Sequence, residues 1–482
     1  MPFLPYEEPG IAVILSLTSF VLLLNISRYI LDRLLYCGII GQILIGIIWG
    51  LPVGGTAWLT EGYQETIQAL GYLGLIGLVF EGGLSTDLKQ LRKAAYVSIS
   101  VATVGLLVPI ALSFLLLILP FPSSSGTMYP TPLAAFSAGA SLCSTSLGTT
   151  FAILSSANMQ HTRIGVILVG AAMMDDVVGL VMVNIVTTLG SGGMGGWPIA
   201  RPIVASFGLL LVSLGLGAYL LKPIWLYLVK CSHSETAVNV SAGGRFDIKE
   251  ISLTQFRRIP SIEFLLSTLI LIIFVTIASF IDASVLFAAF IAGGVINYLW
   301  DVGNRSIEEE SRSNPAQVMY EEYYKPIMDF ILVPFFFASI GFSIPITDMF
   351  KASIVWKGIV YSILMVIAKC LVSLVMYFEY FAKSWKPRKT QSSAAESTRP
   401  PHLEALLVGF AMVARGEIGF LISSLSQSSG TLLLKNQQNT AIVSGEAVFL
   451  VIVWAVVICT IVGPVVVGIL VRRIRNQALD LD

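Results

Sequence analysis

Long apolar runs separated by short polar segments fill almost the whole chain. About thirteen of these runs are long enough to cross a hydrocarbon core of roughly 30 Å as a helix. Lipid offers backbone groups no hydrogen-bond partner, so each run is predicted to be helical. The pattern therefore predicts an all-α polytopic membrane protein with about 13 transmembrane helices. The runs lie near residues 10–30, 35–51, 66–84, 95–119, 132–154, 163–189, 203–228, 262–281, 283–300, 326–346, 355–378, 404–428 and 446–471.

Composition supports a lipid bilayer as the main surroundings and excludes several classes of soluble protein. Of the 482 residues, 55% are hydrophobic and 12% are charged, against roughly 25% charged residues in a soluble domain. The formal net charge is zero, so no basic surface predicts binding to nucleic acid. The five cysteines show no zinc or disulfide spacing, and the spans contain no histidine cluster. We expect neither enzymatic activity nor an ATP or redox cofactor.

Lysine and arginine are distributed unevenly between the two sides of the predicted bundle. One side carries most of them, including Arg28, Lys383 and Arg473. Basic loops remain in the cytoplasm, so the amino terminus is predicted to face outward or into a lumen and the carboxyl terminus to face the cytoplasm. The sequence leaves open whether the membrane is the plasma membrane or an endomembrane. The opposite side carries four basic residues, namely Arg201, Lys351, Lys357 and Lys435.

The span count also predicts an internal repeat. Thirteen spans divide into six, a linker and six, and the odd offset makes the second six cross the bilayer in the opposite sense. This predicts a first inverted repeat at residues 1–202, a linker helix and cytoplasmic loop at 203–261, and a second repeat at 262–482. The fifth and twelfth spans correspond under this symmetry, and both are unusually polar or interrupted by glycine.

Two adjacent carboxylates, Asp175 and Asp176, lie at the centre of the sixth span. Acids inside a membrane are costly and usually face a water-filled cavity that marks an ion or proton path. Desolvation and mutual repulsion make protons compete with cations for such a pair. Adjacent helix positions point about 100° apart, so one of the two acids is expected to have a different partner. The alternative is a buried, hydrogen-bonded structural pair.

Lys369 lies near the middle of the eleventh span, where a lysine needs a carboxylate or a cavity. Pairing with Asp175 or Asp176 is the simplest assignment. Snorkelling of the long side chain to an interface is the alternative.

The fifth and twelfth spans each contain a segment suited to an interrupted helix. The fifth contains SLCSTSLGTT, with Thr145, Ser146 and Gly148, whose oxygens and flexibility suit a hard cation beside unwound backbone. Close helix packing explains the same small residues. The twelfth contains Arg415, Gly416 and Glu417, and an arginine there could neutralise the carbonyl end of a half-helix. A locking salt bridge and a transport role both remain open for this group.

Several segments, taken in order, resemble the monovalent cation:proton antiporter superfamily, which has the sodium/hydrogen exchanger fold. They are GQILIGIIWG, LVFEGGLSTDL, GAAMMDDVVGL, FFFASIGFSI, the span of Lys369, and ARGEIGF. The resemblance implies a core bundle and a dimerisation bundle, a homodimer, and two discontinuous helices, the fifth and twelfth spans, that cross beside the ion site.

The resemblance also implies residue roles. Asp176 resembles the essential cation-binding and protonatable carboxylate, and Asp175 resembles the acid that partners the lysine in the electrogenic, aspartate-pair branch. Many sodium-selective members carry an acid in the first crossing helix, where this chain has Thr145 and Ser146. This departure leaves Na⁺ and K⁺ both open as substrates, and the Arg415 and Glu417 pair is expected to contribute to the charge balance.

The function expected from these features is exchange of a monovalent cation for protons by alternating access, with a role in pH homeostasis. One alternative is a channel-like cation pathway on the same fold. The other is a membrane receptor or structural bundle that transports nothing.

Overall fold

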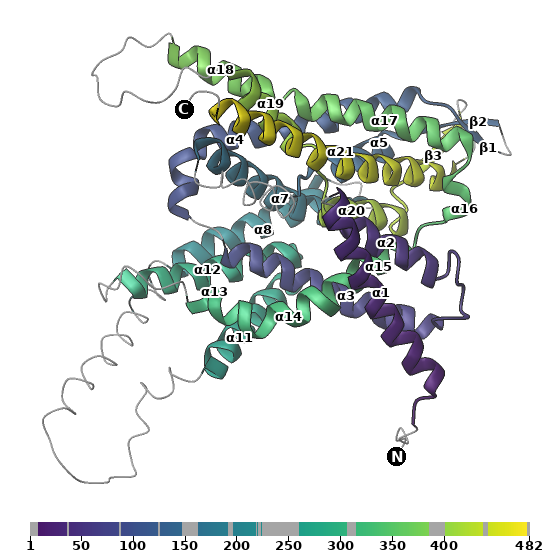
Figure 1. Ribbon diagram of the computed structural model, residues 1–482, viewed down its shortest axis with the longest axis horizontal. Helices are drawn as coiled ribbons and strands as arrows, with labels where there is room; N and C mark the ends of the chain where they lie inside the picture. Colours follow the sequence, from purple (N-terminus) through teal and green to yellow (C-terminus); the bar gives the residue numbers. More distant parts are fainter. Residues whose placement is uncertain are drawn as a thin grey trace, which may run out of the picture. The chain divides into compact units, whose positions relative to one another are not determined.

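The protein is predominantly helical (Figure 1), as the apolar pattern predicts. The computed structural model describes residues 8–35, 38–85, 88–123, 126–146, 162–190, 196–217, 219, 223, 260–305, 315–384, 401–436 and 442–479. Within these ranges, seven helical segments are long and apolar enough to cross a membrane, and shorter apolar helices accompany them. The chain is therefore a multi-pass integral membrane protein. The seven segments are Ile11–Leu34, Glu61–Leu84, Tyr96–Ile118, Ile164–Gly190, Gln317–Phe342, Ala352–Phe381 and Glu446–Val471.

The larger of two compact units consists of residues 1–66, 88–194 and 337–482. Its core is a cluster of buried apolar side chains at residues 101, 164–171, 372, 407–412 and 467–470. Leu168, Leu407 and Met412 are fully buried in this cluster. Its helices are α1 (Ile11–Leu35), α2 (Gly38–Trp49), α4 (Leu88–Ser113), α5 (Pro132–Cys143), α7 (Arg163–Gly190), α16 (Ile346–Met349), α17 (Ala352–Cys370), α18 (Ser373–Ser384), α19 (Pro401–Ala411), α20 (Glu417–Ser428) and α21 (Glu446–Leu479).

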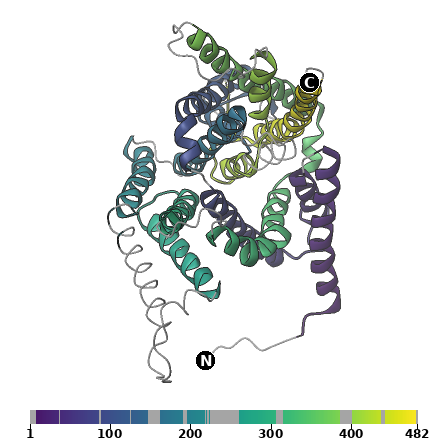
Figure 2. The same cartoon turned by 60° about the vertical axis from the view of Figure 1, so that its left-hand side comes forward.

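The smaller unit consists of residues 67–87 and 195–336. In it α11 (Pro260–Phe280) packs against α12 (Val285–Arg305) (Figure 2). The long helical span that begins at Pro315 consists of three short helices, which two π-helical segments, Tyr320–Tyr324 and Met328–Leu332, join end to end. Ser284 N donates to Ser206 Oγ at 3.0 Å, which connects α8 to the start of α12. The helices are most of α3 (Glu61–Leu84), α8 (Gly196–Leu216), α11 (Pro260–Phe280), α12 (Val285–Arg305), α13 (Pro315–Met319), α14 (Lys325–Ile327) and the start of α15 (Val333–Phe342).

A small antiparallel sheet in the larger unit was not predicted. It has four strands in the order β1 (Phe121–Ser123), β2 (Gly126–Pro130), β3 (Leu433–Asn436) and β4 (Ile442–Ser444). The β2–β3 pairing joins the segment before α5 to the segment after α20, with Tyr129 opposite Lys435. The expectation of a purely helical protein was therefore incomplete. These strands are too short to show a period, and the central pairing joins residues far apart in sequence.

The predicted twelfth span is interrupted. α19 ends at Ala411, α20 begins at Glu417, and the residues between them are not helical. The fifth span begins as α5, which Thr131 caps by accepting a hydrogen bond from Ala134 N at 3.2 Å. α5 ends at Cys143, Ser144 has an extended backbone, and the chain is non-helical through Ser146. The remainder of the predicted fifth span, including Gly148, lies outside the described residues.

Two helix pairs approach closely through facing glycines. In the larger unit, a Cβ added to Gly46 of α2 would collide with the carbonyl oxygen of Ala338, and one added to Gly341 of α15 would collide with that of Ile43. In the smaller unit, Gly83 of α3 and Gly293 of α12 face each other in the same way, with the carbonyls of Phe290 and Phe80. Small residues permit such backbone contact between membrane helices. In both pairs the contact is reciprocal: each glycine faces a carbonyl oxygen of the other helix, and that carbonyl belongs to the residue three positions before the other helix's glycine.

Candidate functional site

The non-helical segments after α5 and α19 touch each other in the interior of the larger unit. Ser146 N donates a hydrogen bond to the carbonyl oxygen of Ala414 at 2.9 Å. A Cβ on Gly416 would lie 2.9 Å from Ser146 Cβ, so this approach requires glycine. α21 also packs closely here, since a Cβ on Gly463 would lie 2.7 Å from Ala414 N. The contact brings together two of the segments that the sequence singled out, and it places Gly416 and Ser146 side by side.

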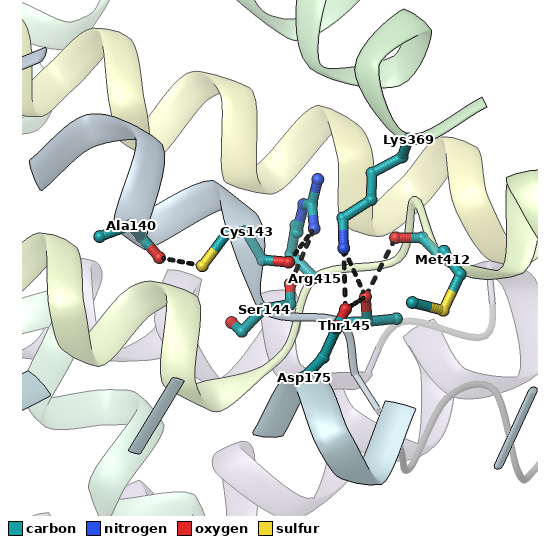
Figure 3. Close-up of polar contacts among 8 residues, drawn as sticks. All are labelled: Ala140, Cys143, Ser144, Thr145, Asp175, Lys369, Met412 and Arg415. Atoms are coloured by element: carbon teal, nitrogen blue, oxygen red, sulfur yellow. Dashed lines mark hydrogen bonds and ion pairs between the residues drawn. The ribbon is translucent and has the colours of Figure 1, made fainter. Parts of the chain in front are cut away.

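Arg415 lies within this contact and is fully buried. Its Nη1 donates to the carbonyl oxygens of Ser144 at 2.8 Å and Cys143 at 3.5 Å (Figure 3). The last carbonyls of a helix carry partial negative charge and lack partners within the helix. The guanidinium therefore compensates the carbonyl end of α5. The side chain of Glu417 lies outside the described residues, so its pairing with Arg415 remains a prediction.

A buried ion pair lies beside these segments (Figure 3). Lys369, in the last turn of α17, places its Nζ 2.9 Å from Asp175 Oδ2, and both side chains are 0% exposed. Lys369 Nζ also donates to Thr145 Oγ1 at 2.9 Å, and Thr145 Oγ1 donates to Asp175 Oδ2 at 2.7 Å. The sequence left open which aspartate meets Lys369, and the structure pairs it with Asp175.

The hydroxyl of Thr145 has two acceptors within reach. Besides Asp175 Oδ2, the carbonyl oxygen of Met412 lies 3.3 Å from Thr145 Oγ1. A hydroxyl donates only one hydrogen, so it serves one acceptor at a time. Thr145 therefore connects the ion pair to the unwound segment after α19. In this arrangement the Thr145 oxygen accepts a hydrogen bond from Lys369 and its hydroxyl hydrogen is donated to Asp175. One of the side chains that the sequence assigned to the cation site therefore takes part in the buried ion pair.

Asp176 follows Asp175 on α7 and is half-buried, whereas Asp175 is completely buried. The angular separation of adjacent helix positions accounts for this difference. Among the described residues, Asp175 Oδ1 and Ser144 Oγ are buried acceptors with no hydrogen-bond partner. Buried polar atoms without partners are costly, so such atoms indicate where water, a proton or a cation binds. The described residues contain no group of three or more metal-ligating His, Cys, Asp or Glu side chains.

Comparison with known proteins identifies the family. A family model described as sodium/hydrogen exchanger, transmembrane, matches residues 14–238 and 243–473. The chain belongs to the sodium/hydrogen exchanger family. The matched ranges include every element of the site described above.

Several relatives of the chain carry antiporter names. The high-affinity Na⁺/H⁺ antiporter NhaS3 of Synechocystis is 25% identical over 371 residues, which are 77% of this chain and 66% of NhaS3. The Na⁺/H⁺-K⁺ antiporter GerN of Bacillus cereus is 24% identical over 84% of this chain and 85% of its own length. A Na⁺/H⁺ antiporter of Enterococcus hirae is 20% identical over 93% of this chain and 96% of its own length.

The sequence did not reveal the backbone carbonyl groups that take part in the site. The carbonyls of Cys143, Ser144 and Met412 receive or face the polar side chains of the site. No side-chain pattern indicates which carbonyls a break in a helix leaves unpaired. Gly105 was also missed: a Cβ there would lie 3.3 Å from Lys369 Nζ. A glycine within an apolar run carries no signal that distinguishes it from general packing.

The bridging hydroxyl gives a first prediction. Replacing Thr145 with valine keeps the shape of the side chain but leaves Lys369 and Asp175 each short of one hydrogen bond. We expect Thr145→Val to lower the free energy of unfolding by about 1–3 kcal/mol, and Thr145→Ser to be close to wild type. Thermal unfolding in detergent measures the difference. Equal stability of the Val and Ser variants would contradict a bridging role for the hydroxyl.

Proposed function

We propose that this chain is a secondary active antiporter that exchanges a monovalent cation, Na⁺ or K⁺, for protons by alternating access. Membership of the sodium/hydrogen exchanger family and the antiporter names of the relatives support this function. The observation that carries it at the level of the site is the fully buried Asp175–Lys369 pair, next to the more accessible Asp176 and the non-helical backbone that follows α5 and α19.

In this proposal Asp176 binds the cation and, in its absence, protons. A monovalent cation must shed water to enter the bundle, and a carboxylate with neighbouring oxygens replaces that water. We propose the unpaired Asp175 Oδ1 and Ser144 Oγ as candidates for such oxygens. The Asp175–Lys369 pair corresponds to the aspartate-pair branch, so we propose electrogenic exchange, with more than one proton per cation.

The choice between Na⁺ and K⁺ is also a proposal. One relative is named a Na⁺/H⁺ antiporter and another a Na⁺/H⁺-K⁺ antiporter. Thr145 and Ser146 stand where many sodium-selective members carry an acid. With that acid absent, we propose that the chain accepts K⁺ as well as Na⁺.

The finer architecture belongs to the same proposal: about 13 spans, two inverted repeats separated by a linker, and crossed interrupted helices. The two facing-glycine contacts support the repeats. Inversion exchanges the second span with the ninth and the third with the tenth, so the α2–α15 contact maps onto α12–α3. Both pairs have the same reciprocal geometry. The repeat boundaries at 202 and 261, a homodimer, and an outward amino terminus in a plasma membrane or endomembrane are proposed with it.

Purified protein in proteoliposomes tests the function. We expect addition of Na⁺ or K⁺ outside to drive protons out of the vesicles, at a rate that saturates with cation concentration. A channel-like pathway would instead conduct cations without moving protons against their gradient. A receptor or structural bundle would move neither.

A further inference from the structure

The ammonium group of Lys369 is enclosed on the side of α4 by a glycine. Nζ donates to Asp175 Oδ2 and Thr145 Oγ1. Gly105, which is buried in α4, also lies close to Nζ. A Cβ added there would lie 3.3 Å from Nζ, 3.4 Å from Met412 Cε and 3.6 Å from Val372 Cγ2. A side chain at position 105 would therefore press against the ammonium, and one larger than a single carbon would compete with it for space.

We propose that Gly105 is a positioning residue for the transport reaction: its lack of a side chain leaves room for the Lys369 ammonium, so that the lysine can reach Asp175 and Thr145 together. The inference rests on the proposed function for its effect on transport. Glycine in a helix interior costs about 1 kcal/mol relative to alanine. The close approach of Lys369 Nζ explains why a glycine stands in the interior of α4 in spite of this cost.

The proposal gives a graded expectation for side chains at position 105. A single Cβ requires Nζ and Met412 Cε, both at the ends of flexible side chains, to move by a few tenths of an ångström. Valine adds two methyl groups about 1.5 Å further out, and a methyl directed toward Nζ would come well inside contact distance. The ammonium must then leave hydrogen-bonding distance of Asp175 Oδ2 or Thr145 Oγ1. Alanine should be tolerated and valine should not.

Transport measurements separate this role from general packing. We expect Gly105→Ala to remain within about threefold of wild type, and Gly105→Val to lower the maximal rate by about tenfold or more. We also expect Gly105→Val to be no slower than Lys369→Ala, and the double variant to be no slower than Lys369→Ala alone. Gly468→Val is the control, because a Cβ at Gly468 of α21 meets nothing within 4 Å. A double variant that is slower by the product of the two single effects overturns the proposal.

Thermal unfolding tests the contact between position 105 and the Lys369 ammonium without any measurement of transport. In wild type, we expect Gly105→Val to lower Tm more than Gly468→Val does. In a Lys369→Ala background, the extra loss of Tm in Gly105→Val over Gly468→Val should become smaller. The same is expected in Asp175→Asn/Lys369→Ala, which leaves no unpaired buried carboxylate. A remainder is expected from Met412 and Val372, which also lie near position 105. An unchanged penalty of Gly105→Val in both backgrounds contradicts the proposal. Failure of wild type to move ions would overturn the proposed function but leave this thermal comparison intact.

Discussion

Asp176→Asn is expected to abolish cation-driven proton movement. The amide has nearly the shape of the carboxylate, but it carries no charge to attract a cation and takes up no proton in the transport range. Asp176 is half-buried on α7, so the substitution removes a charge from the membrane interior and leaves the fold intact. The measurement is proton movement out of proteoliposomes on addition of Na⁺ or K⁺, with the amount of incorporated protein determined for each variant.

Asp348→Asn is the matched control for this variant. Asp348 lies in the short helix α16, where it forms an exposed ion pair with Lys351 at 2.8 Å. The same acid-to-amide change there is expected to leave the rate close to wild type. Full activity of Asp176→Asn would remove that residue from the mechanism, whereas loss of activity in both variants would point to a general effect of lost acidic charge.

Lys369→Met is expected to cause the largest loss of stability among the single changes considered. It keeps the length of the side chain but leaves the Asp175 carboxylate, which is 0% exposed, without its cation. Removing one partner of a buried pair typically costs about 3–5 kcal/mol, because an unpaired charge remains in the interior. Uptake of a proton by Asp175 relieves part of this penalty. The variant should therefore be closest to wild type at acidic pH and fall further behind as the pH rises.

The measurement is thermal unfolding of the detergent-solubilised protein across a pH series. Lys351→Met breaks an exposed ion pair, Lys351–Asp348, whose side chains are 61% and 41% exposed. Its loss should be at most about 1 kcal/mol, well below that of Lys369→Met. If Lys369→Met were as stable as Lys351→Met at every pH, the buried pair would not be the stabilising contact described above.

The sequence predicted the membrane class of this protein and the location of its polar interior well. Apolar runs long enough to span a bilayer coincide with described helices, because lipid allows few other solutions for the backbone. Asp175, Asp176, Lys369 and Arg415 stood out because ionisable side chains inside apolar runs are rare. Their chemical type was enough to single them out. Their partners could be narrowed but not fixed: helix geometry separated the two aspartates without showing which one faces Lys369.

Other features could not be read from local pattern. The pairing of β2 with β3 joins residues about 300 positions apart, and short strands carry too few residues for a period of two to be recognised. The contact of Ser146 N with the Ala414 carbonyl depends on backbone atoms that every residue possesses. Gly105 matters because the Lys369 ammonium, which comes from a distant part of the sequence, lies next to it. Such features depend on how distant segments meet, which the sequence alone does not state.

Coupling of the two ion movements can be tested in proteoliposomes. Wild-type protein is reconstituted at equal internal and external pH, the membrane potential is clamped, and an outward gradient of Na⁺ or K⁺ is imposed. We expect protons to accumulate inside against their own gradient as the cation leaves, and Asp176→Asn vesicles to show no such accumulation. Cation efflux in the wild type without any uphill proton movement would contradict the exchange mechanism.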